Sequence, residues 1–322
     1  MVKIWITGGA GTLGGTLADE LFKAGYDVSV NDIVRKDEAW KLESRDQIPY
    51  HWISTIDLPK SALNGVDIII DCGIGYADRP FGIESPMTNY FGNIAPAVNL
   101  VKQISKMNRK PTIIYPSSYN QYYGFRGTYT EETPLTPNSE YGWTKAAVSM
   151  LYSSAHRQYN IPFIGTVVGS EFGPKMRSDE LIGKLILYLL QNKDFKLRSP
   201  GSERLWGYIG DAVEAYRKII DKYNEFNGYN FHISGNSGDT IVSNINLAHR
   251  VKEIIQSRFI QTKSSIYPVG YEPGETVNGK PISFHIDSSF TRKTLNWSPK
   301  HTLVEGLKET VDWFRENIWR YQ

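Results

Sequence analysis

The feature that most restricts the fold is a glycine-rich run after a short apolar segment near the amino terminus, Thr7-Gly8-Gly9-Ala10-Gly11-Thr12-Leu13-Gly14. Lys3 to Thr7 predicts a buried strand, Thr12 to Ala24 predicts a helix with an apolar face, and Asp27 to Asn31 predicts a second strand. Strand, turn, helix and strand form the smallest unit that joins two parallel strands. The chain therefore begins in the way that a doubly wound α/β protein begins.

The same run predicts a dinucleotide site. Glycines at these positions allow a tight turn and let a phosphate approach the backbone amides at the helix N-terminus. Asp32 ends the second strand, where a carboxylate accepts hydrogen bonds from an adenosine ribose and repels a 2′-phosphate. We therefore expect NAD as cofactor, with NADP less favoured through Arg35 and Lys36. The predicted cofactor residues here are Gly8, Gly11, Thr12, Leu13, Gly14 and Asp32.

The rest of the chain predicts two lobes. Buried strands are expected at Val66 to Asp71, Thr112 to Tyr115 and Ile161 to Val168, with helices at about Thr88 to Lys106 and from Tyr141. This alternation predicts a Rossmann-type doubly wound parallel sheet. After Gly169 the pattern is less regular, which indicates a smaller, interleaved α/β substrate lobe. We expect a dinucleotide-binding domain at residues 1–168, joined again by 208–235, and a mainly substrate-binding lobe at 169–322.

Composition excludes several classes of function. The 322 residues carry a net charge of +2 and no long basic run, so nucleic acid is not an expected partner. No apolar run approaches the ~20 residues that cross a bilayer, and no export signal precedes the first strand, so we expect a soluble, cytoplasmic protein. One cysteine, Cys72, rules out an internal disulfide, and the six histidines show no metal-ligand spacing.

A second motif, Tyr141-Gly142-Trp143-Thr144-Lys145, resembles the extended short-chain dehydrogenase/reductase family of NAD-dependent nucleotide-sugar epimerases and dehydratases, UDP-glucose 4-epimerase among them. The resemblance implies an enzyme that binds its cofactor also through Asp57, Leu58, Tyr141 and Lys145. It further implies a homodimer formed by helices near Thr88 to Lys106 and Tyr141 to Gln158. Other landmarks of the resemblance are Asn89, Glu131-Glu132-Thr133-Pro134, Gly173-Pro174, the run Arg204 to Asp211, and Leu295-Asn296-Trp297-Ser298-Pro299.

The spacing and side-chain chemistry of Tyr141 and Lys145 suit a pair that transfers protons. They are four residues apart and so share a helix face, where a lysine ammonium stabilises a phenolate. An anchored phenolate can accept the proton of a sugar hydroxyl as hydride leaves its carbon. The resemblance adds a Ser or Thr usually four residues before a Tyr-Gly pair. Counting back from Tyr123-Gly124 reaches Tyr119, and allowing one inserted residue reaches Ser118. We predict Ser118, with Ser117 and Tyr119 as alternatives.

The residues that follow Ser118 favour some reactions of the family over others. Dehydratases of the family carry acids just after the Ser/Thr, because loss of water needs an acid for the leaving hydroxyl. This chain has Tyr119, Asn120 and Gln121 there. We therefore predict an NAD-dependent nucleotide-sugar 4-epimerase with Tyr141 as general base. An NAD(P)-dependent sugar or uronate dehydrogenase or ketoreductase is the alternative, and a 4,6-dehydratase or a non-catalytic dinucleotide-binding protein is less favoured.

The predicted substrate residues are Ser118, Ser170, Arg204 and Tyr208. Arg204 opens a run resembling the family segment whose arginine holds a substrate pyrophosphate, and a guanidinium fork suits two phosphates. Two departures make the pocket atypical. Ser170 stands where many relatives have Asn, and the run at 270–275 lacks the late arginine of many relatives. A free sugar or uronate therefore stays open beside a nucleotide sugar.

Overall fold

The chain folds into two units, each made of separate segments. The computed structural model describes residues 1–74, 90–123, 125, 127–235, 240–259, 262–271, 276–277, 280–281 and 285–321, so Asn89, Gly124 and the run at 272–275 lie outside the described residues. The first unit comprises Met1–Val168, Val213–His232 and Ser288–Leu295, and the second comprises Gly169–Ala212, Ile233–Asp287 and Asn296–Gln322. The sequence indicated no return of the chain at 288–295. The roles assigned to the two units stay predictions.

The first unit is built on a seven-stranded sheet with the order β3-β2-β1-β4-β5-β7-β11. The pairings from β3 across to β7 are all parallel, which confirms the predicted doubly wound α/β fold. The order reverses between β1 and β4, and ligands of such sheets bind beyond the carboxyl ends of the strands at that reversal. The strands are β1 Lys3–Thr7, β2 Asp27–Asp32, β3 Tyr50–Trp52, β4 Ile68–Asp71, β5 Thr112–Ser118, β7 Phe163–Val168 and β11 Asn230–Ile233.

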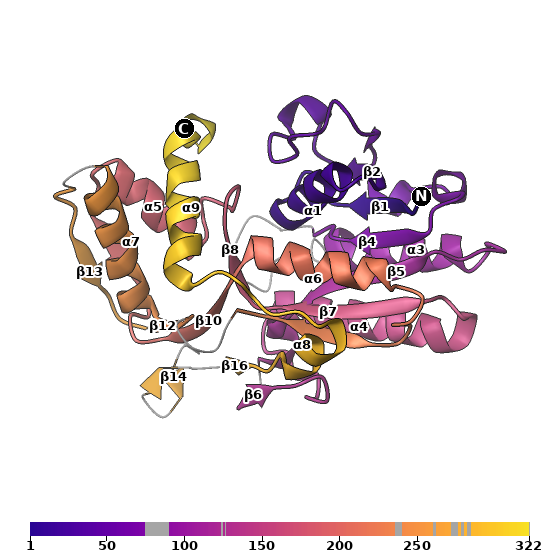
Figure 1. The fold of residues 1–322 in the computed structure, drawn as a ribbon. Helices are drawn as coiled ribbons and strands as arrows, with labels where there is room; N and C mark the ends of the chain where they lie inside the picture. The colour runs from indigo at the N-terminus through magenta and orange to yellow at the C-terminus, as the bar shows by residue number, and fades with distance from the viewer. Residues whose placement is uncertain are drawn as a thin grey trace. The chain divides into compact units, whose positions relative to one another are not determined.

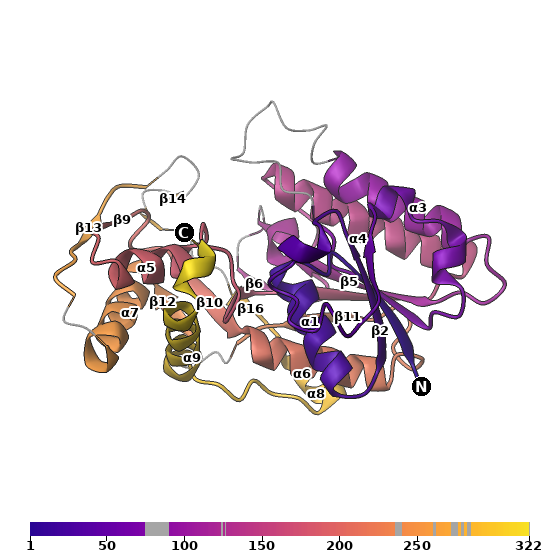
Figure 2. The same cartoon turned by 90° about the horizontal axis from the view of Figure 1, so that it is seen from above.

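Helices cover both faces of this sheet. Helices α3 and α4 lie on one face, and α1 and α6 lie on the other (Figures 1 and 2). The core under α3 and α4 joins Leu100 and Tyr152 of the helices to Ile69 and Ile113 of the strands, and all four are nearly inaccessible to solvent. Burial of such side chains drives the packing. The helices of this unit are α1 Thr12–Lys23, α3 Ala95–Ile104, α4 Glu140–Tyr159 and α8 Ser289–Leu295. Helix α6, Ile209–Asp221, belongs to this unit from Val213 onward.

Most element boundaries lie within about two residues of the sequence prediction, and larger differences occur at β5 and α3. Strand β5 continues past Tyr115 to Ser118, where its last residues pair with Val168 and its neighbours on β7. Helix α3 begins only at Ala95, because Tyr90–Ile94 form a π-helical turn ahead of it. Pro96 sits in the first turn of α3, where its missing N–H costs no helical hydrogen bond.

The second unit combines small sheets with α-helices. Strand β10 is central in a three-stranded sheet with the order β12-β10-β8, parallel to β8 and antiparallel to β12. Leu187, Leu247 and Leu307 belong to one buried cluster contributed by α5, α7 and α9. The elements are β8 Ser170–Phe172, α5 Leu181–Leu190, β9 Phe195–Leu197, β10 Glu203–Tyr208, β12 Ile241–Ser243, α7 Asn244–Arg258, β13 Ile266–Pro268, β14 Thr276–Val277, β15 Lys280–Pro281, β16 His285–Ile286 and α9 Leu303–Glu316. The short strand β6, Thr128–Tyr129, belongs to the first unit.

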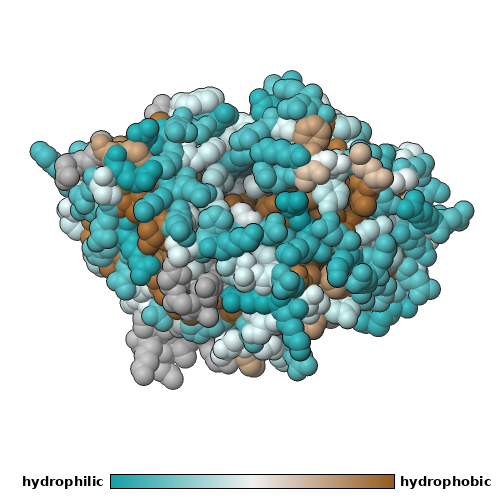
Figure 3. All heavy atoms as spheres, in the orientation of Figure 1, coloured by the Kyte–Doolittle hydropathy of each residue, from teal (hydrophilic) through white to brown (hydrophobic). Residues whose placement is uncertain are grey.

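One face of the molecule is largely polar. On the face drawn in Figure 3, hydrophilic side chains predominate and hydrophobic ones are exposed between them in small groups. In the part of the chain that the structure describes, no helix combines the length and the apolar character needed to span a membrane.

Candidate active site

The glycine loop lies between β1 and α1 and fits a phosphate group. Gly8 has a φ of 65°, in the left-handed region that favours glycine. A Cβ at Gly14 would lie 2.3 Å from the Gly8 carbonyl oxygen, so a side chain there would push the loop away from the helix. Helix α1 begins at Thr12, has Gly11 as its N-cap without a side-chain cap, and carries no acidic residue in its first turn. Its N-terminal amides can therefore receive an anion.

Asp32 is tied directly to this loop. Its Oδ2 accepts a hydrogen bond from the Ala10 N–H at 2.9 Å, and its Oδ1 accepts one from the Val34 N–H at 3.0 Å. An ionised carboxylate has about four lone-pair sites, so acceptor capacity remains for ribose hydroxyls. These contacts fix the carboxylate beside the loop, and the residues present fit an adenosine ribose with free hydroxyls.

The two cations near Asp32 are paired with other carboxylates. Arg35 Nε lies 3.4 Å from Asp37 Oδ1, and Lys36 Nζ lies 3.1 Å from Asp46 Oδ1. The Arg35 guanidinium also lies 5.5 Å from the centre of the Trp52 ring. These contacts give no support to a 2′-phosphate site at Arg35 and Lys36.

Asp57 and Leu58 lie just after β3, as the resemblance requires. Asp57 is exposed and ends a 3₁₀ turn, Thr55–Asp57, whereas Leu58 is buried. The Asn99 side chain of α3 donates hydrogen bonds to the Thr55 and Leu58 carbonyl oxygens at 2.8 and 3.0 Å. The turn is thereby held against the helix, although its predicted contact with a cofactor stays a prediction.

Tyr141 and Lys145 lie on adjacent turns of α4 and share a face. The Lys145 ammonium lies 5.9 Å from the centre of the Tyr141 ring and donates a 2.8 Å hydrogen bond to the Pro116 carbonyl oxygen of β5. Only 2% of Lys145 is exposed, and this burial lowers its pKa to about 8, against the raising effect of the Asp71 carboxylate. Lys145 is thus fixed beside Tyr141 in a setting where its charge depends on its neighbours.

The geometry distinguishes the three candidates for the third catalytic group. The Ser117 hydroxyl donates to Gln121 Oε1 at 2.7 Å and accepts from the Ser149 hydroxyl at 3.2 Å. Ser118 Oγ instead accepts from the Asn120 N–H and side-chain amide, and no described residue accepts its proton. Tyr119 is buried in the 3₁₀ turn Tyr119–Tyr122. Ser118 therefore has a hydroxyl proton to donate, which supports the predicted choice.

Gly142 brings Tyr141 close to the Ser118 segment. A Cβ at Gly142 would lie 2.4 Å from the Asn120 carbonyl oxygen, which is too close for any side chain. The Ser139 hydroxyl caps α4 by accepting from the Gly142 N–H at 3.1 Å. The first turn of α4 and the turn after β5 are therefore in direct backbone contact.

A buried network beneath the pair was not predicted from the sequence. Asp71, at the end of β4, accepts hydrogen bonds from the Thr7 hydroxyl at 2.6 Å and from the Tyr152 hydroxyl at 2.5 Å. Its signal in the sequence is a carboxylate at the end of an otherwise apolar strand, beside the reversal in strand order. Another contact that sequence did not indicate joins the Lys41 ammonium to the Thr12 hydroxyl at 2.9 Å, at the start of α1.

The remaining predicted substrate residues lie in the second unit. Ser170 is buried on β8 beside Trp206, and Arg204 is half-buried on β10 beside Val242. The Tyr208 hydroxyl donates to a carboxylate oxygen of Glu309, and its ring lies 4.5 Å from that of His301. Burial and the Glu309 carboxylate raise the pKa of Tyr208. Tyr208 thus joins β10 to α9, and its contacts give no support to substrate binding.

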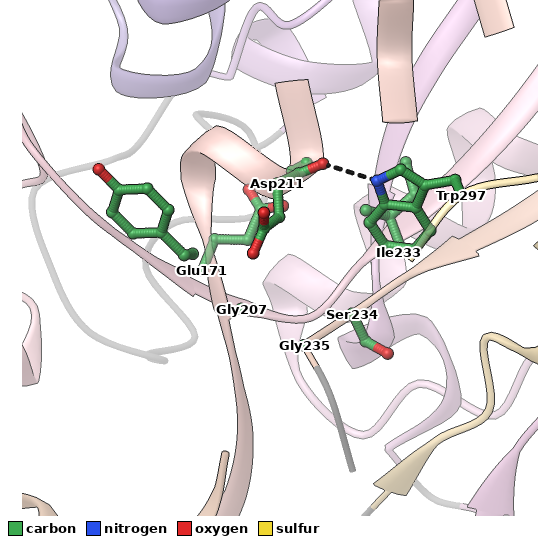
Figure 4. Close-up of a pocket in the computed structure, with 9 residues that line it drawn as sticks. Glu171, Gly207, Asp211, Ile233, Ser234, Gly235 and Trp297 are labelled. Carbon is green, nitrogen blue, oxygen red and sulfur yellow. Dashed lines mark hydrogen bonds between the residues drawn. The ribbon is translucent and has the colours of Figure 1, made fainter. Parts of the chain in front are cut away.

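The second unit also contains a small pocket, in which apolar and acidic side chains meet (Figure 4). It has about 180 Å³ of space free of protein atoms, part of it open to solvent. Asp211 is engaged there by the Lys300 and His301 N–H groups, and its carbonyl oxygen accepts from Trp297 Nε1 at 3.1 Å. Burial raises the pKa of Glu171 to about 8. The pocket is lined by Glu171, Gly207, Tyr208, Asp211, Ala212, Ile233, Ser234, Gly235 and Trp297.

Comparison with known proteins identifies the family. Residues 4–234 match the NAD dependent epimerase/dehydratase family. The chain is 25% identical to a dTDP-glucose 4,6-dehydratase of Neisseria gonorrhoeae, over 99% of this chain and 97% of that protein.

Two solved structures share the fold. UDP-glucuronic acid 4-epimerase from Bacillus cereus, in complex with UDP-glucuronic acid and NAD, matches with a TM-score of 0.86 at 20% identity, over 98% of this chain and 100% of that one. dTDP-glucose 4,6-dehydratase from Bacillus anthracis, in complex with NAD, matches with a TM-score of 0.82 at 22% identity, over 99% and 98%. Because the family match covers most of the chain, this protein is an enzyme that belongs to the NAD-dependent epimerase/dehydratase family, and the resemblance and the cofactor predicted from the sequence are confirmed.

Proposed function

We propose that the protein is an NAD-dependent nucleotide-sugar 4-epimerase. The observation that carries this proposal is the composition of the turn after Ser118. Asn120 and Gln121 place amides there, and both are used in hydrogen bonds with Ser118 and Ser117. An amide cannot supply the proton that a leaving hydroxyl needs, whereas epimerisation at a carbinol carbon needs only one group that accepts and returns a proton.

Proton transfer is the part of the reaction that we assign to this chain. Tyr141, as phenolate, accepts the proton of the sugar C4 hydroxyl and returns it after the sugar presents its other face. Lys145 stabilises the phenolate through its charge, and the Ser118 hydroxyl donates a hydrogen bond to the reacting oxygen. NAD, held by the glycine loop and Asp32, would supply the hydride acceptor for C4 and the hydride that returns to it, so that no reduced cofactor would accumulate.

Cofactor binding is assigned to residues of the first unit. The loop formed by Gly8, Gly11, Thr12, Leu13 and Gly14 receives the pyrophosphate at the N-terminus of α1. Asp32 accepts from the adenosine ribose, and its fixed carboxylate favours NAD over NADP. Asp57 and Leu58, together with Tyr141 and Lys145, complete the set.

The substrate class is a nucleotide sugar, with a free sugar or uronate as the alternative. Arg204 is assigned to the substrate pyrophosphate, because the residue is half-buried on β10 and a guanidinium fork suits two phosphates. Ser170 is assigned to the substrate as well. Tyr208 belongs to the same predicted set of substrate residues, but its hydroxyl already donates a hydrogen bond to Glu309.

The assembly that we propose is a cytoplasmic homodimer formed through α3 and α4. The outer faces of these two helices expose Val98, Trp143 and Met150, by 43, 48 and 61% respectively. Trp143 and Met150 are seven residues apart on α4, so they share one face. Exposed large apolar side chains on adjacent helices suit the core of an interface between two copies.

A product screen tests the reaction. The purified protein is incubated with NAD and UDP-, dTDP-, GDP- and CDP-sugars and free uronates, while NADH absorbance and sugar NMR spectra are recorded. We expect a new 4-epimer of one nucleotide sugar without accumulated NADH. Stoichiometric NADH with an oxidised sugar would replace the proposal with a dehydrogenase. A 4-keto-6-deoxy product would show that the amides after Ser118 do not prevent dehydration, and would replace it with the reaction of the dTDP-glucose 4,6-dehydratases.

A further inference from the structure

Asp71 is a buried carboxylate that the proposed mechanism does not use. It ends β4, and only 3% of the residue is exposed. The Thr7 and Tyr152 hydroxyls donate to its two oxygens at 2.6 and 2.5 Å. Within the described residues, no cationic side chain forms an ion pair with it. A buried carboxylate is costly unless nearby groups compensate, so its surroundings need an explanation.

The surroundings connect Asp71 to Lys145. Tyr152, which holds Asp71, follows Lys145 by seven residues on α4 and therefore lies on the same face two turns later. The Tyr115 ring packs against both: the Lys145 ammonium lies 4.7 Å from its centre, and the Tyr152 ring centre lies 5.4 Å from it. Strand β4 pairs with β5 up to Ile70 and Ile114, so Asp71 and Tyr115 come directly after paired residues. The four side chains form one buried cluster.

The opposite charges of Lys145 and Asp71 act on each other within this cluster. Burial lowers the pKa of Lys145 to about 8, and the negative charge of Asp71 acts in the opposite direction. Burial raises the pKa of Asp71, and the hydrogen bonds from Thr7 and Tyr152 and the charge of Lys145 act against that rise. Each charged form is therefore stabilised by the other.

The other titratable groups around Lys145 do not replace Asp71. They are Cys72 after β4, Tyr115 on β5, and Tyr141 and Tyr152 on α4. Burial, together with the Asp71 charge, raises the pKa of both Tyr115 and Tyr152 well above its ordinary value, so these two stay neutral. The Cys72 thiol also acts on Lys145, but more weakly than Asp71.

We propose that Asp71 is a positioning residue that keeps Lys145 in its ammonium form and thereby supports ionisation of Tyr141. The inference rests on the roles proposed above for Lys145 and Tyr141. Asp71 touches neither the substrate nor the cofactor in this proposal. It acts through Lys145, from beneath the pair.

The direct test is the titration of Lys145 in the full-length protein, with and without NAD. The ¹³Cε resonance of Lys145, identified by its loss in Lys145→Arg, is followed against pH by NMR in wild type and Asp71→Asn. We expect the midpoint to fall by about one pH unit in Asp71→Asn, because the nearest negative charge is gone. The control is Asp67→Asn, which makes the same change just before the other end of β4 and leaves the midpoint unchanged. An unchanged midpoint in Asp71→Asn would overturn the proposal.

A second variant keeps the test usable where Asp71→Asn does not fold. Tyr152→Phe removes one hydrogen bond to the Asp71 carboxylate and keeps the ring, so the carboxylate is less readily ionised. We expect a smaller fall of the Lys145 midpoint, in the same direction. In both variants the alkaline limb of kcat/KM should move to lower pH by the same amount as the midpoint, and a limb that stays in place would contradict the proposal.

The two proposals fail in distinguishable ways. If the product screen finds no epimer, the reaction is wrong, but the NMR titration still reports whether Asp71 controls Lys145. If an epimer forms and the Lys145 midpoint is the same in wild type and Asp71→Asn, the reaction stands and only the role of Asp71 is lost.

Discussion

Tyr141 carries the proposed chemistry through one oxygen atom, so its removal is the sharpest single change. We expect Tyr141→Phe to lower kcat by roughly 10²- to 10⁴-fold, the usual worth of a general acid–base group. NAD affinity should stay nearly unchanged, because the ring remains. Steady-state kinetics and calorimetric titration with NAD measure the two effects. The matched control is Tyr159→Phe, the same change at an exposed position of the same helix. Retention of more than a tenth of the activity by Tyr141→Phe would remove Tyr141 from the mechanism.

Glu171 gives a residue-scale prediction that does not depend on the reaction. Burial raises its pKa to about 8, so the folded protein holds a proton that the unfolded chain releases above about pH 4.5. The free energy of unfolding therefore falls as pH rises from about 5 to 8, and the fall ends above pH 8. Glu171→Gln removes this penalty. We expect the variant to come close to wild type in stability at pH 5 and to exceed it by up to about 4 kcal/mol at pH 8, as measured by denaturant unfolding. An equal difference at both pH values would contradict the assignment.

At the scale of elements, the contact between α4 and the turn after β5 decides where the catalytic groups meet. Gly142→Ala places a Cβ 2.4 Å from the Asn120 carbonyl oxygen, so the two backbones must separate. We expect at least a tenfold loss of kcat, since a displacement near 1 Å can cost about 10²-fold, and a stability loss of about 1–3 kcal/mol. Gly270→Ala is the control, because a Cβ there meets nothing within 4 Å. Kinetics and thermal unfolding of both variants check the prediction, and full activity in Gly142→Ala would show that the contact is not needed.

The elements also show what sequence can foresee. Strands β1, β2, β4, β5 and β7 were predictable because each is a short apolar run bounded by turns, whereas β3, Tyr50–Trp52, is partly exposed and has no such run. The choice between Ser117 and Ser118 could not be made from the sequence alone. It depends on which of the two hydroxyls forms hydrogen bonds with the side chains of Gln121 and Ser149. The small sheets of the second unit were not predictable either. Strand β8 has three residues, and its partner β10 begins more than thirty residues later, so neither carries a local signal.

At the scale of the whole molecule, the proposed dimer predicts a change of mass. Met150→Asp puts a charge at an exposed methionine on the outer face of α4, where a second copy would bury it at a cost of several kcal/mol. We expect wild type to sediment as a dimer and Met150→Asp as a monomer with an unchanged circular dichroism spectrum. Tyr267→Asp, which makes a similar change at an exposed position of β13 in the second unit, serves as control. A wild-type monomer would exclude this assembly.

The alternation of the chain between its two units has a consequence for biosynthesis. The chain passes from one unit to the other after residues 168, 212, 232, 287 and 295. A nascent chain that has just completed β7 still lacks β11, the last strand of the large sheet, together with α6 and α8. The ribosome must therefore release residue 295 before the first unit has all its segments, and by then Gly169–Ala212 and Ile233–Asp287 of the second unit have also been synthesised. Completion of the first unit thus waits until most of the second has been synthesised, so truncation at residue 168 yields an unfinished sheet rather than a separable domain.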